Sequence, residues 1–303
     1  MAEIGLLLPS REAVIYEPCD GDPRPLVELA QQAEQLGFDS VWVGDSLLAR
    51  PRAEPLTLLA AVASVTTRVR LGTAVLLPSL RNAEQLAQST ATIDAVSGGR
   101  FILGVGAGPG TPGVRVDHEL VGTDFDRRGS GSMRVLQRTR DLWRGVDDQM
   151  YPLPVSPGGP PIWLGGSGPR TLERTGQFAD GWFPTATSHD AYRTGLATVH
   201  AAAQGAGRDP SEVIGAAYLT VVIGPDGPAQ AALEEHSALY YGVPHEVISR
   251  QQGSCAGSSE RVLDWIGGFV DAGARHLCVR IGSSDVEGQL PALAELLTHL
   301  QGR

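Results

Sequence analysis

The chain has 303 residues, of which 42% are hydrophobic and 19% are charged, and its formal net charge is −10. This balance excludes a disordered chain and indicates a large buried core, and no apolar run is long enough to cross a bilayer. The basic residues are scattered along the chain rather than gathered in one stretch, so nucleic acid is excluded as an expected partner.

The N-terminus and the cysteines bear on the cellular compartment. The first residues, MAEIGLLLPS, lead directly into a predicted strand without a basic region or a cleavage site, which favours a cytoplasmic protein. The cysteines, Cys19, Cys255 and Cys278, are far apart and form no CxxC pair. Neither a disulfide framework nor a structural zinc site is therefore expected.

Apolar runs alternate with segments of helical periodicity along the chain. In VRLGTAVLLP (Val69–Pro78) and RFILGVG (Arg100–Gly106), an apolar run ends in small residues, as in a strand buried on both faces. The helix between them is predicted to stop at Gly98-Gly99, which makes a βαβ unit with parallel strands. The other predicted strands are Ile4–Leu8, Phe38–Gly44, Pro161–Gly166, Asp180–Pro184, Gly215–Ile223 and Arg275–Ile281.

Eight strands that alternate with helices predict an α/β fold, a (β/α)8 TIM barrel, and we expect residues 1–303 to form one domain. Two insertions are expected. One is a Gly- and Pro-rich loop from Ala107 to Arg128 after the fourth strand, and the other is a poorly patterned segment from Pro225 to Ser259 after the seventh. Loops of this length are usually functional, so we expect them to decide which substrate binds.

The active site of such a barrel lies at the C-terminal ends of the strands. Asp45, which follows the second strand, is a candidate for orienting a substrate or carrying a proton, or else for capping the next turn. Arg280, near the end of the last strand, is a candidate for binding an anion or for pairing with an acid on the rim. Trp182 is a further candidate for contact with the substrate.

The motif GGSGP, Gly165–Pro169, places glycines at a strand end and a proline where a helix begins. Unpaired amides at a helix N-terminus attract anions, so phosphate binding is preferred here over an ordinary turn. The motif GPGTPG, Gly108–Gly113, matches the dinucleotide fingerprint only formally. Its prolines make a rigid loop, and no acidic residue follows in the context that ribose binding requires.

The seven histidines show no metal-ligand spacing. His118 lies between Asp117 and Glu119 in the first long loop. A solvated charge cluster is the favoured interpretation of these three residues, and His118 is kept as a second candidate proton partner.

Several blocks, in this order, resemble the luciferase-like monooxygenase superfamily. They are GFDSVWVGDS, EPLTLLAAVASVTTRVRLGTAVL, GGRFILGVGAG, FDRRGSGSMRVL and PPIWLGGSGPRTLERTGQFADGW. The resemblance is close from Ile4 to Pro184 and looser as far as the last strand. The superfamily contains flavin-dependent monooxygenases, and reductases or dehydrogenases that use the deazaflavin coenzyme F420.

The resemblance implies a barrel that holds a reduced flavin or deazaflavin at its C-terminal face. It also implies a non-prolyl cis peptide at Ala74-Val75 behind the cofactor ring, and a cofactor phosphate held by the turn Gly165–Gly168. The full set of implied cofactor-binding residues is Ser10, Ser46, Thr73, Ala74, Val75, Gly106, Ala107, Gly108, Gly165, Gly166, Ser167 and Gly168.

Two positions depart from one branch of the superfamily. The sugar-phosphate dehydrogenases of the deazaflavin branch carry a histidine after the second strand, where this chain has Asp45-Ser46. They also carry a glutamate after the fourth strand, where this chain has Pro109. The rest of the pattern resembles deazaflavin-dependent oxidoreductases, so F420 is favoured over FMN as the cofactor.

These inferences predict an oxidoreductase that moves a hydride between F420 and a small, largely apolar organic substrate, with Asp45 or His118 as the proton partner. The alternatives are an FMN-dependent monooxygenase supplied by a separate reductase, a non-catalytic flavin-binding protein, and a phosphate-binding lyase or hydrolase. Relatives are often dimers, so we expect a homodimer. Its interface is expected on the part of the chain that runs from the second strand to the third helix.

Overall fold

The structure is a computed structural model that describes residues 2–16, 22–145 and 150–301. Cys19 lies outside these ranges, whereas Cys255 and Cys278 are buried free thiols. No helix within the described ranges is long and apolar enough to cross a membrane. No group of three or more His, Cys, Asp or Glu side chains among the same residues is placed to hold a metal ion.

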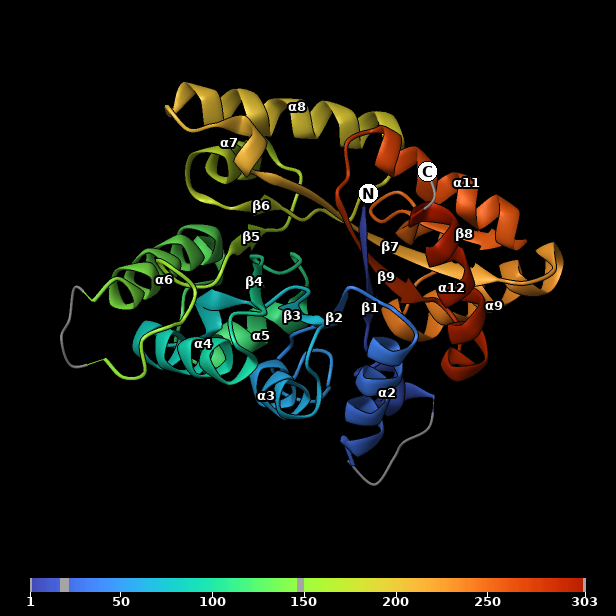
Figure 1. The fold of residues 1–303 in the computed structure, drawn as a ribbon, viewed down its shortest axis with the longest axis horizontal. Helices are drawn as coiled ribbons and strands as arrows, with labels where there is room; N and C mark the ends of the chain where they lie inside the picture. The colour runs from blue at the N-terminus through green and yellow to red at the C-terminus, as the bar shows by residue number, and fades with distance from the viewer. Residues whose placement is uncertain (1, 17–21, 146–149, 302–303) are drawn as a thin grey trace.

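Eight parallel strands close into a barrel (Figure 1). Gly181 of the sixth strand pairs with Ile214 of the seventh, and Glu3 of the first pairs with His276 of the last, which closes the ring. The predicted (β/α)8 barrel is therefore confirmed. In ring order the strands are β1 (Glu3–Leu7), β2 (Ser40–Val43), β3 (Arg70–Thr73), β4 (Phe101–Val105), β5 (Ile162–Leu164), β6 (Gly181–Trp182), β7 (Ile214–Ile223) and β9 (His276–Ile281).

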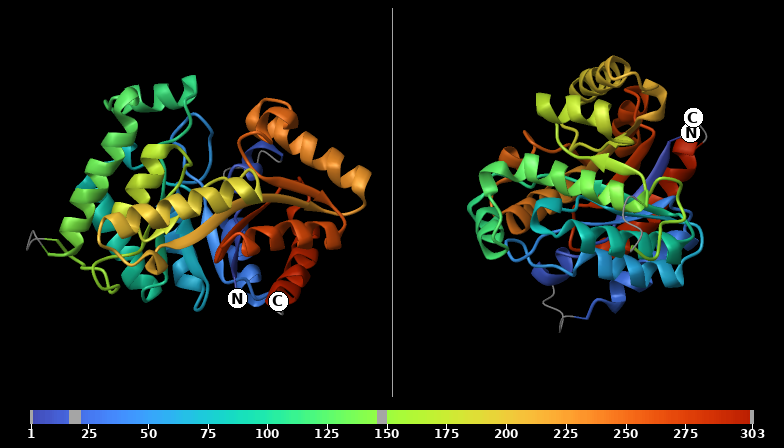
Figure 2. Two further views of the ribbon diagram at one scale, coloured as in Figure 1. Left: turned by 90° about the horizontal axis from the view of Figure 1, so that it is seen from above. Right: turned by 90° about the vertical axis from the view of Figure 1, so that its left-hand side faces the viewer.

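Helices cover the outside of the barrel in all three views of the ribbon (Figures 1 and 2). The eight long ones that alternate with the barrel strands are α2 (Arg24–Gln35), α3 (Pro55–Val65), α4 (Ala83–Ser97), α6 (Arg128–Trp143), α7 (Pro169–Phe178), α8 (His189–Gly205), α11 (Ser259–Asp271) and α12 (Val286–Gln301). The predicted stop of α4 is confirmed, because Gly98 caps it in the left-handed conformation at φ 68°. Four short helices lie in the connections, namely α1 (Glu12–Ile15), η1 (Pro78–Leu80), η2 (Phe125–Arg127) and η3 (Pro210–Glu212).

The two insertions contain more regular structure than their sequences indicate. The predicted loop from Ala107 to Arg128 carries α5 (Pro112–Leu120) and η2. The segment after β7 carries α9 (Asp226–Tyr241), α10 (His245–Ile248) and a ninth strand, β8 (Ser254–Gly257). β8 pairs with the second half of β7, from Thr220 opposite Ser254 to Ile223 opposite Gly257, and it lies outside the ring of eight. Its sequence, SCAG, has no strand-like alternation, which explains why the pattern did not predict it.

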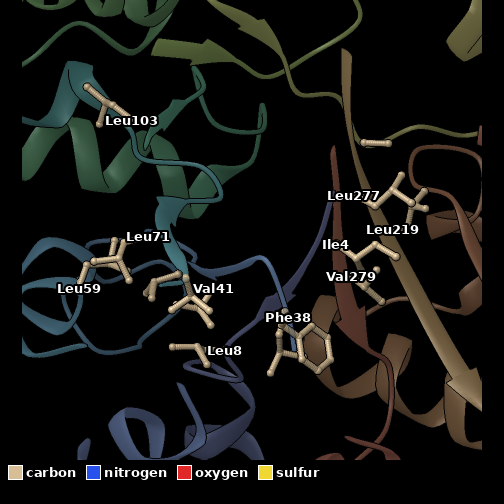
Figure 3. Packing of buried hydrophobic residues seen from close by; sticks show 14 of the residues in the cluster. Ile4, Leu8, Phe38, Val41, Leu59, Leu71, Leu103, Leu219, Leu277 and Val279 are labelled. Carbon is tan, nitrogen blue, oxygen red and sulfur yellow. The ribbon is translucent and has the colours of Figure 1, made fainter. Parts of the chain in front are cut away.

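The core has an outer and an inner layer. The outer layer fills the space between the strands and the helices, and Figure 3 shows Leu59 of α3 beside Leu71 of β3, and Ile4 of β1 near Leu277 and Val279 of β9. The inner layer fills the barrel itself with aromatic and small side chains. Its buried members are Leu7, Trp42, Ile102, Trp163, Phe183, Ala216, Tyr218 and Cys278.

A polar network occupies the barrel interior at the N-terminal ends of β1, β2 and β9. Trp42 Nε1 donates to Ser40 Oγ at 2.7 Å, and Ser40 Oγ lies 2.8 Å from His276 Nε2. His276 Nδ1 lies 2.9 Å from a carboxylate oxygen of Glu3. Because side chains fill the barrel at this level, a ligand has room only at the C-terminal ends of the strands, which we call the barrel mouth.

Candidate active site

One side of the barrel mouth is lined by residues with little or no side chain, at the ends of β2 to β5. We call this part, formed by Gly44, Ala74, Gly106 and Gly165, the glycine side. A Cβ atom at Gly106 would lie 2.7 Å from Val75 Cγ2, and one at Gly165 would lie 3.2 Å from the Phe183 carbonyl oxygen. Neither position has room for a side chain. Ala74, Gly106 and Gly165 are half-buried, and Gly44 is buried beneath the Arg52 guanidinium. Backbone therefore forms the floor of this side, as at strand ends that a ligand approaches closely.

The segment after β3 forms the back of the glycine side. The Ala74-Val75 peptide is cis, as the resemblance implies. The Ala74 amide donates to the Val43 carbonyl at 2.8 Å, and the Leu76 amide donates to the Gly104 carbonyl at 2.8 Å. This segment is thus held by both neighbouring strands, and Ala74 and Val75 pack on the inner core.

The side chain of Thr73 does not point to a ligand. Thr73 is buried, and its hydroxyl donates to the Gly104 carbonyl at 2.6 Å. Its contribution is to fix β4 against β3 at the level of the mouth.

Asp45 is fully engaged by neighbouring groups. Arg81 Nη1 and Nη2 donate to its two carboxylate oxygens at 2.6 and 3.0 Å, and the Leu77 amide donates at 2.8 Å. The Asp45 side chain is 2% exposed. These three bonds occupy both carboxylate oxygens, and they fix the chain beyond the Ala74-Val75 peptide.

The loop after β5 keeps the features of an anion site. Gly166 has φ 108°, and Gly168 is the N-cap of α7 without a side-chain cap. Residues 166–168 are exposed. The amides of Ser167 and Gly168 donate to no other residue in the described part of the chain. These amides, at the N-terminus of a ten-residue helix, are free to bind a phosphate.

Trp182 lies outside the barrel rather than in its mouth. It is buried in the outer core and stacks on Tyr192 with ring centroids 5.1 Å apart. Its indole N–H donates to the Gly166 carbonyl at 2.9 Å. This placement does not support contact with a substrate, and it gives Trp182 a role in holding the loop after β5.

The predicted charge cluster at Asp117, His118 and Glu119 is corrected by the structure, because the first two are buried on α5. Asp117 accepts from the Leu48 and Ala49 amides at 3.0 and 3.1 Å. His118 Nδ1 lies 2.9 Å from Thr123 Oγ1, and its ring packs edge-on against Phe125. Burial, and to a smaller extent the charge of Arg128, lower the pKa of His118. These contacts tie α5 to the loop after β2.

The remaining predicted cofactor residues lie at strand ends. Ser10 is buried after β1, and its amide donates to the Leu8 carbonyl at 2.8 Å. Ser46 Oγ accepts from the Arg50 amide at 2.9 Å. Ala107 and Gly108 are half-buried after β4.

Arginine and tyrosine side chains occupy the other side of the mouth. Arg280 is 5% exposed and donates to the hydroxyl oxygens of Tyr241 at 2.6 Å and Tyr240 at 2.8 Å. Both tyrosines come from α9, in the segment whose sequence pattern was poor. The sequence predicts only Arg280 as a site residue here. The Tyr240-Tyr241 pair forms no recognised motif, and neither do the arginines of the loops after β1 and β2, Arg11, Arg50 and Arg52.

Tyr218 of β7 lies below Arg280 in the inner layer. The Arg280 guanidinium carbon lies 5.1 Å from the centroid of its ring. The Tyr218 hydroxyl makes no hydrogen bond to any residue of the described ranges. Burial raises its pKa well above the ordinary value, and the charge of Arg280 opposes that rise.

Comparisons with known proteins agree with this architecture. The profile of a family described as luciferase-like monooxygenase matches residues 2–264. A 5,10-methylenetetrahydromethanopterin reductase of Methanolobus tindarius is 31% identical over 236 residues, which cover 74% of this chain and 70% of the relative. A phthiodiolone/phenolphthiodiolone dimycocerosates ketoreductase of Mycobacterium bovis (strain BCG / Pasteur 1173P2) is 31% identical over 261 residues, with coverages of 72% and 67%. An F420-dependent secondary alcohol dehydrogenase, solved with an F420-acetone adduct, has the same fold, with a TM-score of 0.82 at 22% identity over 99% of both chains.

Proposed function

This chain belongs to the luciferase-like monooxygenase family, and from that premise we propose that it transfers a hydride between coenzyme F420 and a small organic substrate. Two of the relatives are reductases, and the similar solved structure is of an F420-dependent dehydrogenase. We further propose that residues 1–303 act as one catalytic domain.

The observation that carries this proposal is the glycine side of the mouth, which has a floor of half-buried backbone and a set of unpaired amides beside it. Ala74, Val75, Gly106 and Gly165 would lie against the cofactor ring, and the amides of Ser167 and Gly168 would hold its phosphate. The bound cofactor would supply the redox chemistry, and the protein would position it and exclude water. Ser10, Ser46, Ala107 and Gly108 complete the proposed cofactor site.

Tyr218 is the proposed proton donor. When a carbonyl substrate gains a hydride at carbon, its oxygen gains a proton. The Tyr218 hydroxyl, which has no hydrogen-bond partner within the described ranges, would supply this proton and recover one from water, and the nearby Arg280 cation would stabilise the tyrosinate formed in between. In this proposal Asp45 is a positioning residue, since its carboxylate is held by Arg81 and the Leu77 amide. His118 likewise supports α5 rather than the reaction.

An absorbance spectrum after gel filtration tests the cofactor assignment. The purified protein is mixed with F420 or FMN and passed through the column, and we expect F420 to elute with the protein. Retention of neither chromophore would contradict the proposal for this site.

An FMN-dependent monooxygenase is the second candidate, because the matching family takes its description from that activity. Turnover under anaerobic conditions separates the two. The hydride-transfer enzyme changes the redox state of its bound cofactor without oxygen, whereas the monooxygenase does not turn over without it. A non-catalytic flavin carrier would retain the chromophore and show no substrate-dependent change.

We also propose a homodimer, a separate flavin or F420 reductase as redox partner, and a cytoplasmic location. The dimer proposal is supported by exposed apolar residues on two adjacent segments, the loop after β2 and α5. They are Leu47, Leu48, Val116, Leu120 and Val121. The contact of Asp117 with the Leu48 amide brings these segments together. The loop after β2 belongs to the region where the sequence leads us to expect an interface, and α5 extends the apolar surface beyond it.

A further inference from the structure

Four arginines surround two adjacent tyrosines at one edge of the barrel mouth. We call this group, Arg11, Arg50, Arg52, Arg280, Tyr240 and Tyr241, the arginine–tyrosine cluster. The guanidinium carbons of Arg280 and Arg11 lie 4.0 and 4.9 Å from the centroid of the Tyr240 ring. The guanidinium carbon of Arg50 lies 5.3 Å from the centroid of the Tyr241 ring.

The hydroxyl of Tyr240 links the two halves of the cluster. Its oxygen accepts from Arg280 Nη2 at 2.8 Å and from Arg52 Nη2 at 3.3 Å. A Cβ atom at Gly44 would collide with Arg52 Nη1, so this guanidinium lies over the end of β2. The cluster therefore borders the glycine side directly.

Positive charge is in excess within the cluster. Glu12, which is 4% exposed, lies 3.4 Å from Arg280 Nε and is the acid paired with it. Within the described ranges no acidic side chain pairs with Arg11, Arg50 or Arg52. Three acids of adjoining segments are engaged elsewhere, Asp45 and Glu54 by Arg81 and Asp117 by backbone amides.

Several buried polar atoms of the cluster make no hydrogen bond. Arg11 Nε and Nη1 make none within the described ranges, and Arg280 Nε and Glu12 Oε1 form an ion pair at 3.4 Å without a hydrogen bond. Burial is the main cause that lowers the pKa of Arg11, and the charges of Arg52 and Arg50 lower it further. Buried donors and crowded like charges are costly unless an anion completes them.

The position of the cluster separates it from the proposed phosphate site. In the closed ring three strands separate β1 from β5 in either direction. Arg11 and Glu12 follow β1, whereas the amides of Ser167 and Gly168 follow β5. A cofactor with its phosphate at β5 would thus have the cluster at the opposite edge of the mouth.

We propose that the arginine–tyrosine cluster binds an oxyanion of the substrate, a carboxylate or a phosphate group, and so holds the reacting carbon over the cofactor ring. This inference rests on the proposed function, and it replaces the largely apolar substrate that the sequence leads us to expect. Arginine suits the role, because its planar guanidinium forms paired, charge-assisted bonds to carboxylate and phosphate oxygens.

Calorimetric titration of the cofactor-free protein at low ionic strength tests the proposal. The probes are 4-oxopentanoate, its neutral amide 4-oxopentanamide, and inorganic phosphate. We expect at least one of the two anions to bind at least about tenfold more tightly than the amide, since a hydrogen bond to a charged group is worth about 1.5–3 kcal/mol. The variants Arg11→Gln and Arg52→Gln should each weaken that binding by about tenfold or more.

Arg144→Gln is the matched control, because Arg144 follows α6 on the other end of the barrel and is exposed. It should leave anion binding unchanged, and thermal melting of each variant should show that it folds. The proposal is overturned if neither anion binds in a saturable way, if the amide binds as tightly, or if the Arg11 and Arg52 variants behave like the Arg144 control. A further result would also overturn the proposal. If FMN or F420 displaces the anion and Arg52→Gln leaves anion binding unchanged, the anion binds at the loop after β5 and not at the cluster.

The same titration is independent of the cofactor assignment. A protein that retains neither chromophore but binds the anion through Arg11 and Arg52 would fail the proposed function and keep the anion site. A protein that retains F420 and ignores both anions would keep the proposed function and lose the anion site.

Discussion

Arg81 donates to both carboxylate oxygens of Asp45, from Nη1 to Oδ2 at 2.6 Å and from Nη2 to Oδ1 at 3.0 Å. The same guanidinium reaches Glu54 at 3.1 Å, so it joins the loop after β2 to the segment after β3. Burial lowers the pKa of Arg81, but the charges of Asp45 and Glu54 and their hydrogen bonds together outweigh burial and raise it. The Asp45–Arg81 pair therefore fixes the segment that follows Ala74 and Val75 on the glycine side.

The variant Arg81→Met should destabilise the protein strongly. It would leave the Asp45 carboxylate, which is 2% exposed, without its cation, and breaking a buried pair in this way costs roughly 3 kcal/mol. Urea unfolding measures the change. Arg193→Met removes an exposed pair with Asp190 and should cost less than about 1 kcal/mol, so equal losses in the two variants would disprove the role given to Asp45.

The variant Gly165→Ala should weaken cofactor binding by about tenfold or more. The added methyl group would lie about 3.2–3.3 Å from the Phe183 and Val105 carbonyl oxygens and from Val75, and overpacking costs about 1–3 kcal/mol. Fluorescence titration with F420 or FMN measures the affinity. Gly205→Ala is the control, because a Cβ there meets nothing within 4 Å, and affinity that is unchanged in both variants would argue against the glycine side as the cofactor floor.

The variant Tyr218→Phe should lower kcat by about 10²-fold or more while the cofactor still binds, as expected when a general acid is removed. The control is Tyr192→Phe, since Tyr192 is also buried and its hydroxyl lacks a partner among the described residues, but it packs outside the barrel. Steady-state kinetics across the pH range gives the comparison. Equal kcat values for Tyr218→Phe and the unmodified protein would exclude Tyr218 as the proton donor.

Stability should fall as the pH falls below about 6.5. Burial, aided by the charges of Arg280 and His245, lowers the pKa of His236 from 6.5 to about 3. His236 therefore stays neutral in the folded state while the unfolded chain takes up a proton, so its contribution is complete above about 6.5 and is lost as the pH falls toward 3. Urea unfolding at a series of pH values measures the slope. His236→Gln should make it shallower, and His200→Gln should not.

The variants Leu48→Asp and Leu120→Asp should convert the proposed dimer into monomers. These side chains are 62% and 59% exposed on the two adjacent apolar segments, and a charge in a buried interface is costly. Sedimentation velocity measures the oligomeric state. Leu239→Asp, at an exposed position on α9, is the control, and a wild-type protein that sediments as a monomer would end the dimer proposal.

The barrel could be predicted from the sequence because its signals are local. Glycines that end helices, such as Gly98, and apolar runs such as FILGV recur along the chain. The cis peptide at Ala74-Val75 is confirmed, and it was predicted from the resemblance to a family. The phosphate site at Gly165–Gly168 stays a prediction, made because glycines at a strand end precede a helix there.

The rest of the site depends on contacts between distant segments, which composition and periodicity do not reveal. Asp45 and His118 looked available because the pattern does not show Arg81, 36 residues away, or the packing of α5. Trp182 alternates with Phe183 on a very short strand, and the pattern does not tell which of the two faces inward. Tyr240 reaches Arg280 only because α9 returns over the mouth.

The segment between β7 and β9 is attached to β7 at its start and, through β8, again near its end. α9 leaves directly from β7, and β8 returns the chain to the second half of that strand. The tyrosines of the arginine–tyrosine cluster thus belong to a module that can be exchanged without reordering the ring of eight. If both proposed sites are correct, exchanging this module in a designed chimera should change the substrate that binds and leave cofactor binding unchanged.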